Sequence, residues 1–261
     1  MIDFIPSVCY TLLKLCAPLS ASVNGRDFCG GIMGKIKSFV NYFTVFERCL
    51  WLSSIALITV SFMLFDRSSY LSLVASLIGV TALIFCAKGN PTGQALMIVF
   101  ALIYGYISFT FAYYGEMMTY LCMSLPMAAV SFISWIRNPY KGNKSEVEIA
   151  KLGKREFLII GLISIAVTVV SYFVLYIFGT ANLIPSTLSV ATSFFAASLI
   201  FKRSPWFALA YAVNDVVLIV LWSLAMLEDP SYVSVTVCFV VFLVNDMYSF
   251  INWRRMEKRQ K

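Results

Sequence analysis

Two pairs of polar residues stand inside long apolar stretches of this 261-residue sequence, at Asn214-Asp215 and Asn245-Asp246. Of the 13 acidic residues, only these two aspartates remain once the polar segments and the termini have been set aside. A carboxyl group in an apolar environment is costly and is usually retained for a function. An amide and a carboxyl group beside aromatic rings suit a flat polar ring compound, because the amide bonds its edge while the rings stack on its face.

Three interpretations of these pairs stay open. The asparagines contact a substrate while the aspartates orient them, the pairs brace neighbouring helices, or the aspartates carry protons. Two carboxyl groups that share a proton also serve aspartyl proteases, so an intramembrane protease is the rival enzyme hypothesis. Asn precedes both acids here, whereas those proteases carry a Gly-x-Gly-Asp context. We therefore favour substrate contact.

Helical spacing brings further side chains to the two pairs. Asn214 lies roughly 12 Å inside its helix and Asn245 roughly 10 Å from the end of the next, so antiparallel helices place them at similar depth. Trp222 lies two helical turns beyond Asp215, and Tyr248 lies about one turn beyond Asn245. Gln94, at the start of an earlier helix, either lines a pore or caps that helix. The candidate substrate-binding residues are Asn214, Asp215, Trp222, Asn245, Asp246, Tyr248, Tyr104 and Gln94.

The elements that must position these residues are membrane-spanning helices. Hydrophobic residues make up 60% of the chain and charged residues 13%, which is about half the charged fraction of an ordinary soluble domain. The apolar segments have the roughly 20-residue length of a bilayer span and are continuous rather than alternating, which favours helices over a barrel. We predict an all-α polytopic membrane protein with eight transmembrane helices, at about 45–65, 69–87, 95–113, 117–135, 157–178, 183–201, 206–226 and 231–252.

The placement of charge predicts the orientation. When the two sides are followed from one span to the next, 19 of the 20 Lys and Arg residues fall on one side and only Arg67 on the other. Basic residues gather on the cytoplasmic side, so we predict cytoplasmic N- and C-termini. The 136–156 loop is also predicted to be cytoplasmic. Its basic residues are interpreted as an orientation signal, and we expect no nucleic-acid partner.

The sequence repeats itself. Phe132–Arg137 resembles Phe250–Arg255, 118 residues later, and the same offset aligns Tyr104 with Trp222. Four spans separate equivalent points, so the two copies are parallel; the alternative explanation is chance similarity between apolar stretches. The predicted layout is a leader at 1–44, an extra helix at 45–65, a first three-helix bundle at 69–135, a loop at 136–156, a connector helix at 157–178, a second three-helix bundle at 183–252 and a basic tail at 253–261.

The composition excludes several kinds of chemistry. The chain has no histidine, which removes Ser-His-Asp and Cys-His nucleophile systems and His-ligated zinc. Its seven cysteines are scattered and never form Cys-x-x-Cys. The glycine-rich run at 29–36 has Cys29 where a phosphate-binding loop begins with Gly, and Ile36 where it needs Ser or Thr. We expect no metal, no cofactor and no enzymatic activity.

Two long stretches resemble a known family. They are RSPWFALAYAVNDVVLIVLW at 203–222 and FLVNDMYSFINWRRM at 242–256, and both are similar to the PnuC nicotinamide riboside transporter family. The similarity is strongest over 183–256 and looser over 69–138. It implies a SWEET-like 3+1+3 core and a homotrimer with a separate path in each protomer. It further implies that Asn214 and Asn245 hydrogen-bond the substrate and that Trp222 stacks near its nicotinamide or ribose.

The resemblance also implies a function. The expected protein is a facilitator in the lipid bilayer of the bacterial inner (plasma) membrane. It takes up nicotinamide riboside, an NAD precursor, by alternating access. A cytosolic kinase would then trap the product by phosphorylation. Some branches of the family carry thiamine or riboflavin, so these two vitamins are the alternative substrates.

Overall fold

The computed structural model describes residues 42–67, 69–110, 117–180 and 182–261. The chain divides into two units, residues 1–48 and 49–261. In the described part of the first unit, the Thr44 N–H donates to Glu47 Oε2 at 2.7 Å and the Glu47 N–H donates to Thr44 Oγ1 at 3.2 Å. This capping box satisfies two of the N–H groups that the start of a helix leaves unpaired. Nearly all of the predicted 1–44 leader lies outside the described residues.

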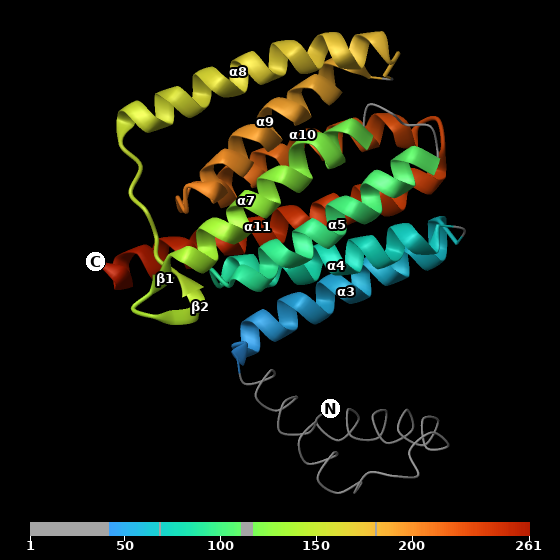
Figure 1. The fold of residues 1–261 in the computed structure, drawn as a ribbon. Coiled ribbons are helices and arrows are strands. Elements are labelled where there is room, and N and C mark those ends of the chain that lie inside the picture. The colour runs from blue at the N-terminus through green and yellow to red at the C-terminus, as the bar shows by residue number, and fades with distance from the viewer. Residues whose placement is uncertain (1–41, 68, 111–116, 181) are drawn as a thin grey trace, which may run out of the picture. The chain divides into compact units, whose positions relative to one another are not determined.

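In the described part of the chain, eight helices are long and apolar enough to cross a bilayer (Figure 1). This confirms the predicted class, an all-helical protein with eight membrane-spanning helices. The helical elements are α3 (Val45–Phe65), α4 (Tyr70–Ala87), α5 (Pro91–Thr110), η2 (Thr119–Ser124) running into α7 (Leu125–Arg137), α8 (Lys154–Ile177), α9 (Leu183–Phe201), α10 (Phe207–Met226), and η3 (Pro230–Tyr232) running into α11 (Val233–Gln260).

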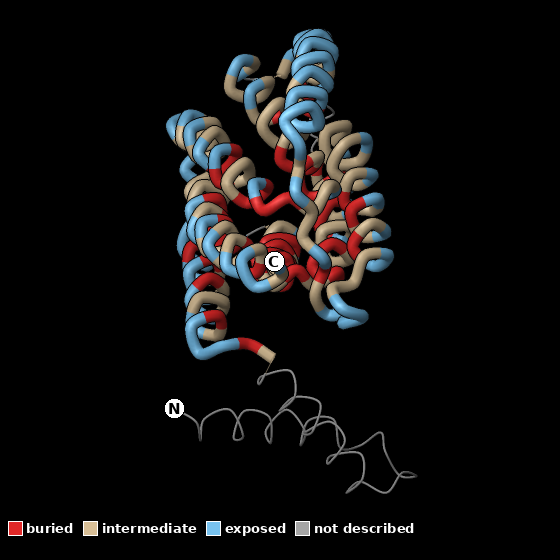
Figure 2. Tube along the Cα trace, turned by 90° about the vertical axis from the view of Figure 1, so that its left-hand side faces the viewer, coloured by how far each residue is buried: buried red, intermediate tan, exposed pale blue. Residues whose placement is uncertain are grey.

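Apolar side chains cover the outward faces of these helices. Figure 2 shows exposed residues along the outer sides of the helices and buried residues between them. On α8, Leu158, Ile165 and Ile177 are 64%, 62% and 78% exposed. In water such continuous apolar surface would promote aggregation, whereas lipid tails are as apolar as leucine side chains. The described helices therefore fit a bilayer rather than water.

The segment between α7 and α8, predicted as a loop, contains a short antiparallel hairpin. Its strands are β1 (Pro139–Tyr140) and β2 (Asn143–Val147). Lys141 and Gly142 have φ angles of 47° and 79°, the left-handed pair that a two-residue hairpin turn requires. Strands of two and five residues carry too little alternation to be recognised in a sequence.

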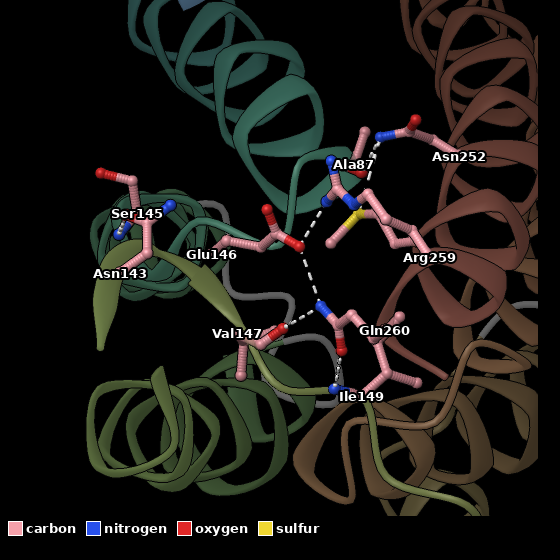
Figure 3. A network of polar contacts seen from close by, with 10 residues as sticks. Ala87, Asn143, Ser145, Glu146, Val147, Ile149, Asn252, Arg259 and Gln260 are labelled. Atoms are coloured by element: carbon pink, nitrogen blue, oxygen red, sulfur yellow. Dashed lines mark hydrogen bonds and ion pairs between the residues drawn. The ribbon is translucent and has the colours of Figure 1, made fainter. Parts of the chain in front are cut away.

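The C-terminal end of α11 is fastened to this hairpin (Figure 3). Gln260 Oε1 accepts from the Ile149 N–H at 2.8 Å, and Gln260 Nε2 donates to Glu146 Oε1 at 2.8 Å and to the Val147 carbonyl at 3.1 Å. Arg259 forms an ion pair with the same Glu146 carboxylate. The helix therefore continues to Gln260, and the predicted tail at 253–261 is an extension of α11.

Replacing Gln260 with Ala is expected to loosen the hairpin. The change leaves the Ile149 N–H and the Val147 carbonyl without their side-chain partners, at a cost of about 1 kcal/mol for each hydrogen bond. Hydrogen–deuterium exchange of the 143–149 segment should become about tenfold faster. Lys258→Ala, at an exposed position on the same helix end, is the control and should leave the exchange unchanged. Equal exchange in both variants would contradict a fastening role for Gln260.

Helices α4 and α5 pack with their backbones in close approach at Gly93. A Cβ atom added there would lie 2.6 Å from Cys86 Sγ, 2.7 Å from the Cys86 backbone nitrogen and 2.8 Å from the Ala82 carbonyl oxygen. Two of these neighbours are backbone atoms, which cannot move aside without shifting α4. A glycine is therefore required at this position.

Gly93→Ala is expected to destabilise the protein, because overpacking a close contact typically costs about 1 to 3 kcal/mol. Gly161→Ala on α8 is the matched control, since an added Cβ there meets no atom within 4 Å and alanine favours helix by about 1 kcal/mol. Thermal unfolding of the purified proteins in detergent measures the difference. The expected order of melting temperatures has Gly93→Ala below the parent protein and Gly161→Ala at or above it.

Candidate functional site

A cavity of about 180 Å³ lies among the helices and draws on both predicted bundles. Helices α4, α5, η2 and α7 contribute residues from the first bundle, and α9, α10 and α11 contribute residues from the second. Apolar side chains form most of its wall. The polar and aromatic residues that matter for recognition are Gln94, Tyr211, Asn214, Asp215, Trp222 and Asp246.

One face of α10 supplies the longest strip of the cavity wall. Its lining residues recur at intervals of three and four, which is the spacing of one helical face. Asn214, Asp215 and Trp222, predicted to lie together, do share this face. The strip consists of Phe207, Tyr211, Asn214, Asp215, Leu218, Leu221 and Trp222.

The amide of Asn214 is oriented by α9. Its Oδ1 accepts hydrogen bonds from Thr192 Oγ1 and from Ser193 Oγ, each at 2.8 Å. Two donors occupy the carbonyl end of the side chain, so the NH₂ end is the one left to meet a ligand. Because Asn214 is 5% exposed, the donor is held in a largely buried place.

The two buried aspartates meet in the cavity wall. The carboxyl groups of Asp215 and Asp246 lie within hydrogen-bonding reach of each other, and the residues are only 4% and 3% exposed. A hydrogen bond between two carboxyl groups requires a proton on at least one of them, so a bonded pair carries at most one negative charge. Antiparallel α10 and α11 thus bring together the acids of the two Asn-Asp pairs.

Asn245 is not among the cavity-lining residues. Its Nδ2 donates to Ser54 Oγ at 3.0 Å and to the Val241 carbonyl at 2.8 Å, so the side chain faces α3. This position follows from helical geometry, because adjacent residues point about 100° apart, and Asp246 takes the cavity face. The geometry around Asn245 is that of a brace between helices. Direct contact between Asn245 and a substrate stays a prediction, and the position of Asn245 outside the cavity lining does not support it.

Gln94 and Trp222 both line the cavity. Gln94 lies near the start of α5, and Trp222 lies near the end of α10. Gln94 is 2% exposed, and its Nε2 donates to Cys86 Sγ at 3.2 Å. Trp222 packs against Tyr232 with ring centroids 5.2 Å apart. Trp222 therefore presents an aromatic surface to the cavity, as a stacking residue must.

Tyr104 and Tyr248 lie outside the cavity lining. The Tyr104 hydroxyl is 3.3 Å from Ser76 Oγ, and its ring lies 4.7 Å from that of Phe100 and 5.1 Å from that of Tyr120. Tyr104 therefore packs within the first bundle. Direct substrate contact by Tyr104 or Tyr248 stays a prediction.

Two tryptophans pack behind the lining residues Cys86, Ile200 and Phe207 at one end of the cavity. Trp135, at the end of α7, donates to the Ile200 carbonyl at the end of α9 at 3.1 Å, and Trp253 of α11 donates to the Cys86 carbonyl at the end of α4 at 2.8 Å. The two indole rings lie 5.4 Å apart. Each hydrogen bond therefore joins helices of the two predicted bundles. The internal sequence repeat that relates the bundles stays a prediction.

The opposite end of the cavity is reached through different elements. Thr119 of η2, Thr180 after α8 and Ser186 near the start of α9 contribute to its lining. Residues Thr119–Ser124 form a π-helix directly before Pro126, and such wide turns occur frequently at functional sites. The cavity therefore runs from the tryptophan layer towards the helix ends on the other side.

Sequence reasoning missed several residues of this site. Tyr211 lies one turn before Asp215 on the lining face of α10, so the same helical spacing that selected Trp222 also predicts it. Thr192 and Ser193 gave no comparable signal, because hydroxyl residues are common in membrane helices and usually bond their own backbone. The contact of these two residues with Asn214 depends on how α9 packs on α10.

The lining of the cavity offers no positive charge to a ligand. None of the described residues that line it is Lys or Arg, whereas the Asp215–Asp246 pair is in its wall. The cavity therefore favours neutral or cationic ligands over anions.

A bundle of spanning helices around a cavity with a few polar and aromatic lining residues is typical of a membrane transport protein. Residues 69–255 match the profile of the family described as the nicotinamide mononucleotide transporter family. The chain belongs to this family, which confirms the family resemblance noted in the sequence.

Relatives of this chain carry a more specific name. It is 28% identical over 220 residues to the nicotinamide riboside transporter PnuC of Neisseria mucosa, covering 83% of each chain. It is 22% identical over 224 residues to the protein of the same name from Haemophilus influenzae, covering 85% of this chain and 96% of the other. A crystal structure of the vitamin B3 transporter PnuC, 26% identical, superposes with a TM-score of 0.71 and covers 84% of this chain and 94% of that one.

Proposed function

We propose that this chain carries nicotinamide riboside into the cell by facilitated diffusion. The proposal joins two facts: the chain belongs to the transporter family named above, and its cavity is lined by a buried amide, aromatic side chains and two carboxyl groups. The Asn214 amide would donate to the carboxamide oxygen or to a ribose hydroxyl, and Trp222 would stack on the ring. No bond in the substrate changes, so no catalytic residue and no cofactor are needed.

The residues that line the cavity favour one of two substrates. The family is named for nicotinamide mononucleotide and the relatives are named for nicotinamide riboside. Nicotinamide mononucleotide differs from the riboside by a phosphate group, which is recognised in proteins by Arg, Lys or helix N-termini. The described lining residues include neither Lys nor Arg and do include two aspartates. A phosphate would therefore find no cationic partner there, and this is the observation that supports the riboside.

Two rival functions stay as alternatives. Thiamine and riboflavin suit an amide-and-aromatic pocket, and a thermal-shift panel of the three vitamins on purified protein separates them. An intramembrane aspartyl protease would use the Asp215–Asp246 contact as its catalytic pair. Family membership favours a transporter, and a protease would lose all hydrolysis on Asp215→Asn.

The orientation and assembly belong to the same proposal. The basic ends of the helices, the hairpin and both termini would face the cytoplasm of a bacterium, and the protein would be a homotrimer in the inner membrane. A cytosolic kinase would trap the product. The helices would form a SWEET-like 3+1+3 core, with α4, α5 and α7 in one bundle, α8 as the connector and α9, α10 and α11 in the other.

Alternating access would then operate through the tryptophan layer. Trp135 and Trp253 bond across the two bundles at the end that carries the basic residues, and the cavity extends away from them. Release of substrate to the cytoplasm would require these cross-bundle bonds to break. The hairpin and the end of α11 lie at the same end of the bundle and would move with the bundles.

Purified protein is expected to bind nicotinamide riboside at least about tenfold more tightly than nicotinamide mononucleotide, because the phosphate has no cationic partner. Trp222→Ala should weaken binding of the riboside by about tenfold through loss of stacking. Trp206→Ala is the control, since Trp206 lies outside the cavity lining and is 44% exposed. Isothermal titration calorimetry measures each affinity. Tighter binding of the mononucleotide would contradict the proposed substrate.

Uptake into vesicles that contain no kinase is expected to stop when the inside concentration of riboside equals the outside concentration. The membrane potential is held at zero in this measurement, because the pyridinium ring of the riboside is positively charged and would otherwise follow the potential. Vesicles loaded with the kinase and ATP should continue to accumulate product. Concentration of free riboside above the outside level would show active transport instead.

A further inference from the structure

We propose that a groove at the basic end of the helices binds the headgroup of an anionic phospholipid. The groove has a volume of about 470 Å³ and shares no lining residue with the central cavity. Its lining comes from residues 150–154, Phe157, residues 204–206 and Glu257, and we call it the basic groove. A lipid site here adds a second ligand to the protein and does not depend on which vitamin the central cavity carries.

Segments from three parts of the chain form the basic groove. Residues 150–154 lead from the hairpin into α8, residues 204–206 form the turn before α10, and Glu257 lies near the end of α11. Figure 1 shows the segment before α8 at the end of the bundle that carries the C-terminus. Because spanning helices begin or end at all three segments, the groove lies at the level of the lipid headgroups.

Hydrogen bonds hold the segment before α8 in place. The Ala150 N–H donates to the Arg203 carbonyl at 3.1 Å, and the Gly153 N–H donates to Glu156 Oε2 at 3.2 Å. The same Glu156 carboxylate forms an ion pair with Lys202 Nζ at 3.2 Å. The backbone of this segment is therefore fixed at both ends, and the nearest glutamate on α8 already has its own cationic partner.

The charges that line the basic groove are unbalanced. They belong to Lys151, Lys154 and Glu257. The Glu257 carboxylate already has two cationic partners, Arg254 Nη1 at 2.6 Å and Lys261 Nζ at 3.3 Å. Among the residues that the structure describes, no acidic side chain forms an ion pair with Lys151 or Lys154, and both lysines are exposed. Two adjacent positive charges without an acidic partner attract an anion.

Aromatic side chains at the edge of the groove indicate that the anion belongs to a lipid. Phe157, in the first turn of α8, and Trp206, directly before α10, line the groove and are each 44% exposed. Leu158, beside Phe157, is 64% exposed. Tryptophan is enriched where acyl chains meet headgroups. A phospholipid offers a phosphate to the lysines and apolar chains to these residues, whereas a free phosphate ion leaves the apolar edge without a partner.

The state of Glu257 favours an anionic lipid over a zwitterionic one. The ammonium group of phosphatidylethanolamine needs an acceptor beside the phosphate site, and the carboxylate in the groove is already paired with two cations. Phosphatidylglycerol carries the phosphate charge and two hydroxyl groups, so it brings no positive charge close to Lys151 and Lys154. Basic clusters at the ends of spanning helices recognise anionic headgroups in this way.

The test compares phosphatidylglycerol with phosphatidylethanolamine of the same short acyl chains. Their affinities for the full-length protein in detergent are measured by microscale thermophoresis. The wild-type protein is expected to bind phosphatidylglycerol at least about tenfold more tightly, because each lysine near an anionic headgroup is worth a severalfold preference. Inorganic phosphate is titrated in the same way and is expected to bind at least about tenfold more weakly than phosphatidylglycerol, since it makes no apolar contact.

The double variant Lys151→Gln/Lys154→Gln removes both charges from the groove. Its affinity for phosphatidylglycerol should fall about tenfold, while its affinity for phosphatidylethanolamine should change by less than about threefold. Arg255→Gln/Lys258→Gln is the matched control, because it removes the same charge from exposed positions on α11 that do not line the groove. The control should keep the wild-type preference, and both variants should keep the wild-type affinity for nicotinamide riboside.

Each result supports or overturns the lipid site. Equal affinity of the wild-type protein for the two lipids would overturn selection of an anionic headgroup. Equal losses in the two double variants would show a general attraction to the basic end of the protein and would overturn the groove as the site. Inorganic phosphate that binds as tightly as phosphatidylglycerol would assign the groove to a soluble anion instead. Loss of the preference in Lys151→Gln/Lys154→Gln alone supports the site.

Discussion

Lipid supplies neither hydrogen bonds nor ions to a protein, and the rest of this structure depends on that constraint. Every backbone group in a spanning segment must be satisfied within the chain, which requires helices, and every polar side chain must turn inward or lie at a helix end. The eight spanning helices place apolar residues outside and turn Gln94, Asn214, Asp215 and Asp246 towards one cavity. Inward-facing polar groups that lack a hydrogen-bond partner within the protein are thus available to bind a ligand.

Cross-bundle contacts gather at the basic end of the helices. Two tryptophans donate across the predicted bundles to carbonyl groups at helix ends, and these carbonyls also accept from the backbone N–H groups of Gly89 and Arg203. The segment that follows α7 extends the same connection, because the Val147 N–H donates to the Gly89 carbonyl and the Ala150 N–H donates to the Arg203 carbonyl.

Basic and acidic side chains occupy different parts of the protein. Basic residues gather at one set of helix ends, where water and lipid headgroups stabilise them, and the one acidic pair in the cavity wall is inside. This division connects the topology signal to the substrate, because a cavity without a basic residue disfavours a phosphate. Membership of the transporter family and the lining of the cavity therefore point to the same nucleoside.

The sequence by itself determined the helices, their number and the family. These follow from local properties, since spanning length and continuous apolarity need no partner to be recognised, and the motifs at 203–222 and 242–256 are long. It also placed Asn214, Asp215 and Trp222 on one face of one helix. Only the tertiary structure decided that Asp246 rather than Asn245 turns to the cavity and that Thr192 and Ser193 orient Asn214. Those facts depend on how helices rotate against one another, which is set by packing between residues far apart in the chain and is not encoded in the spacing along one helix.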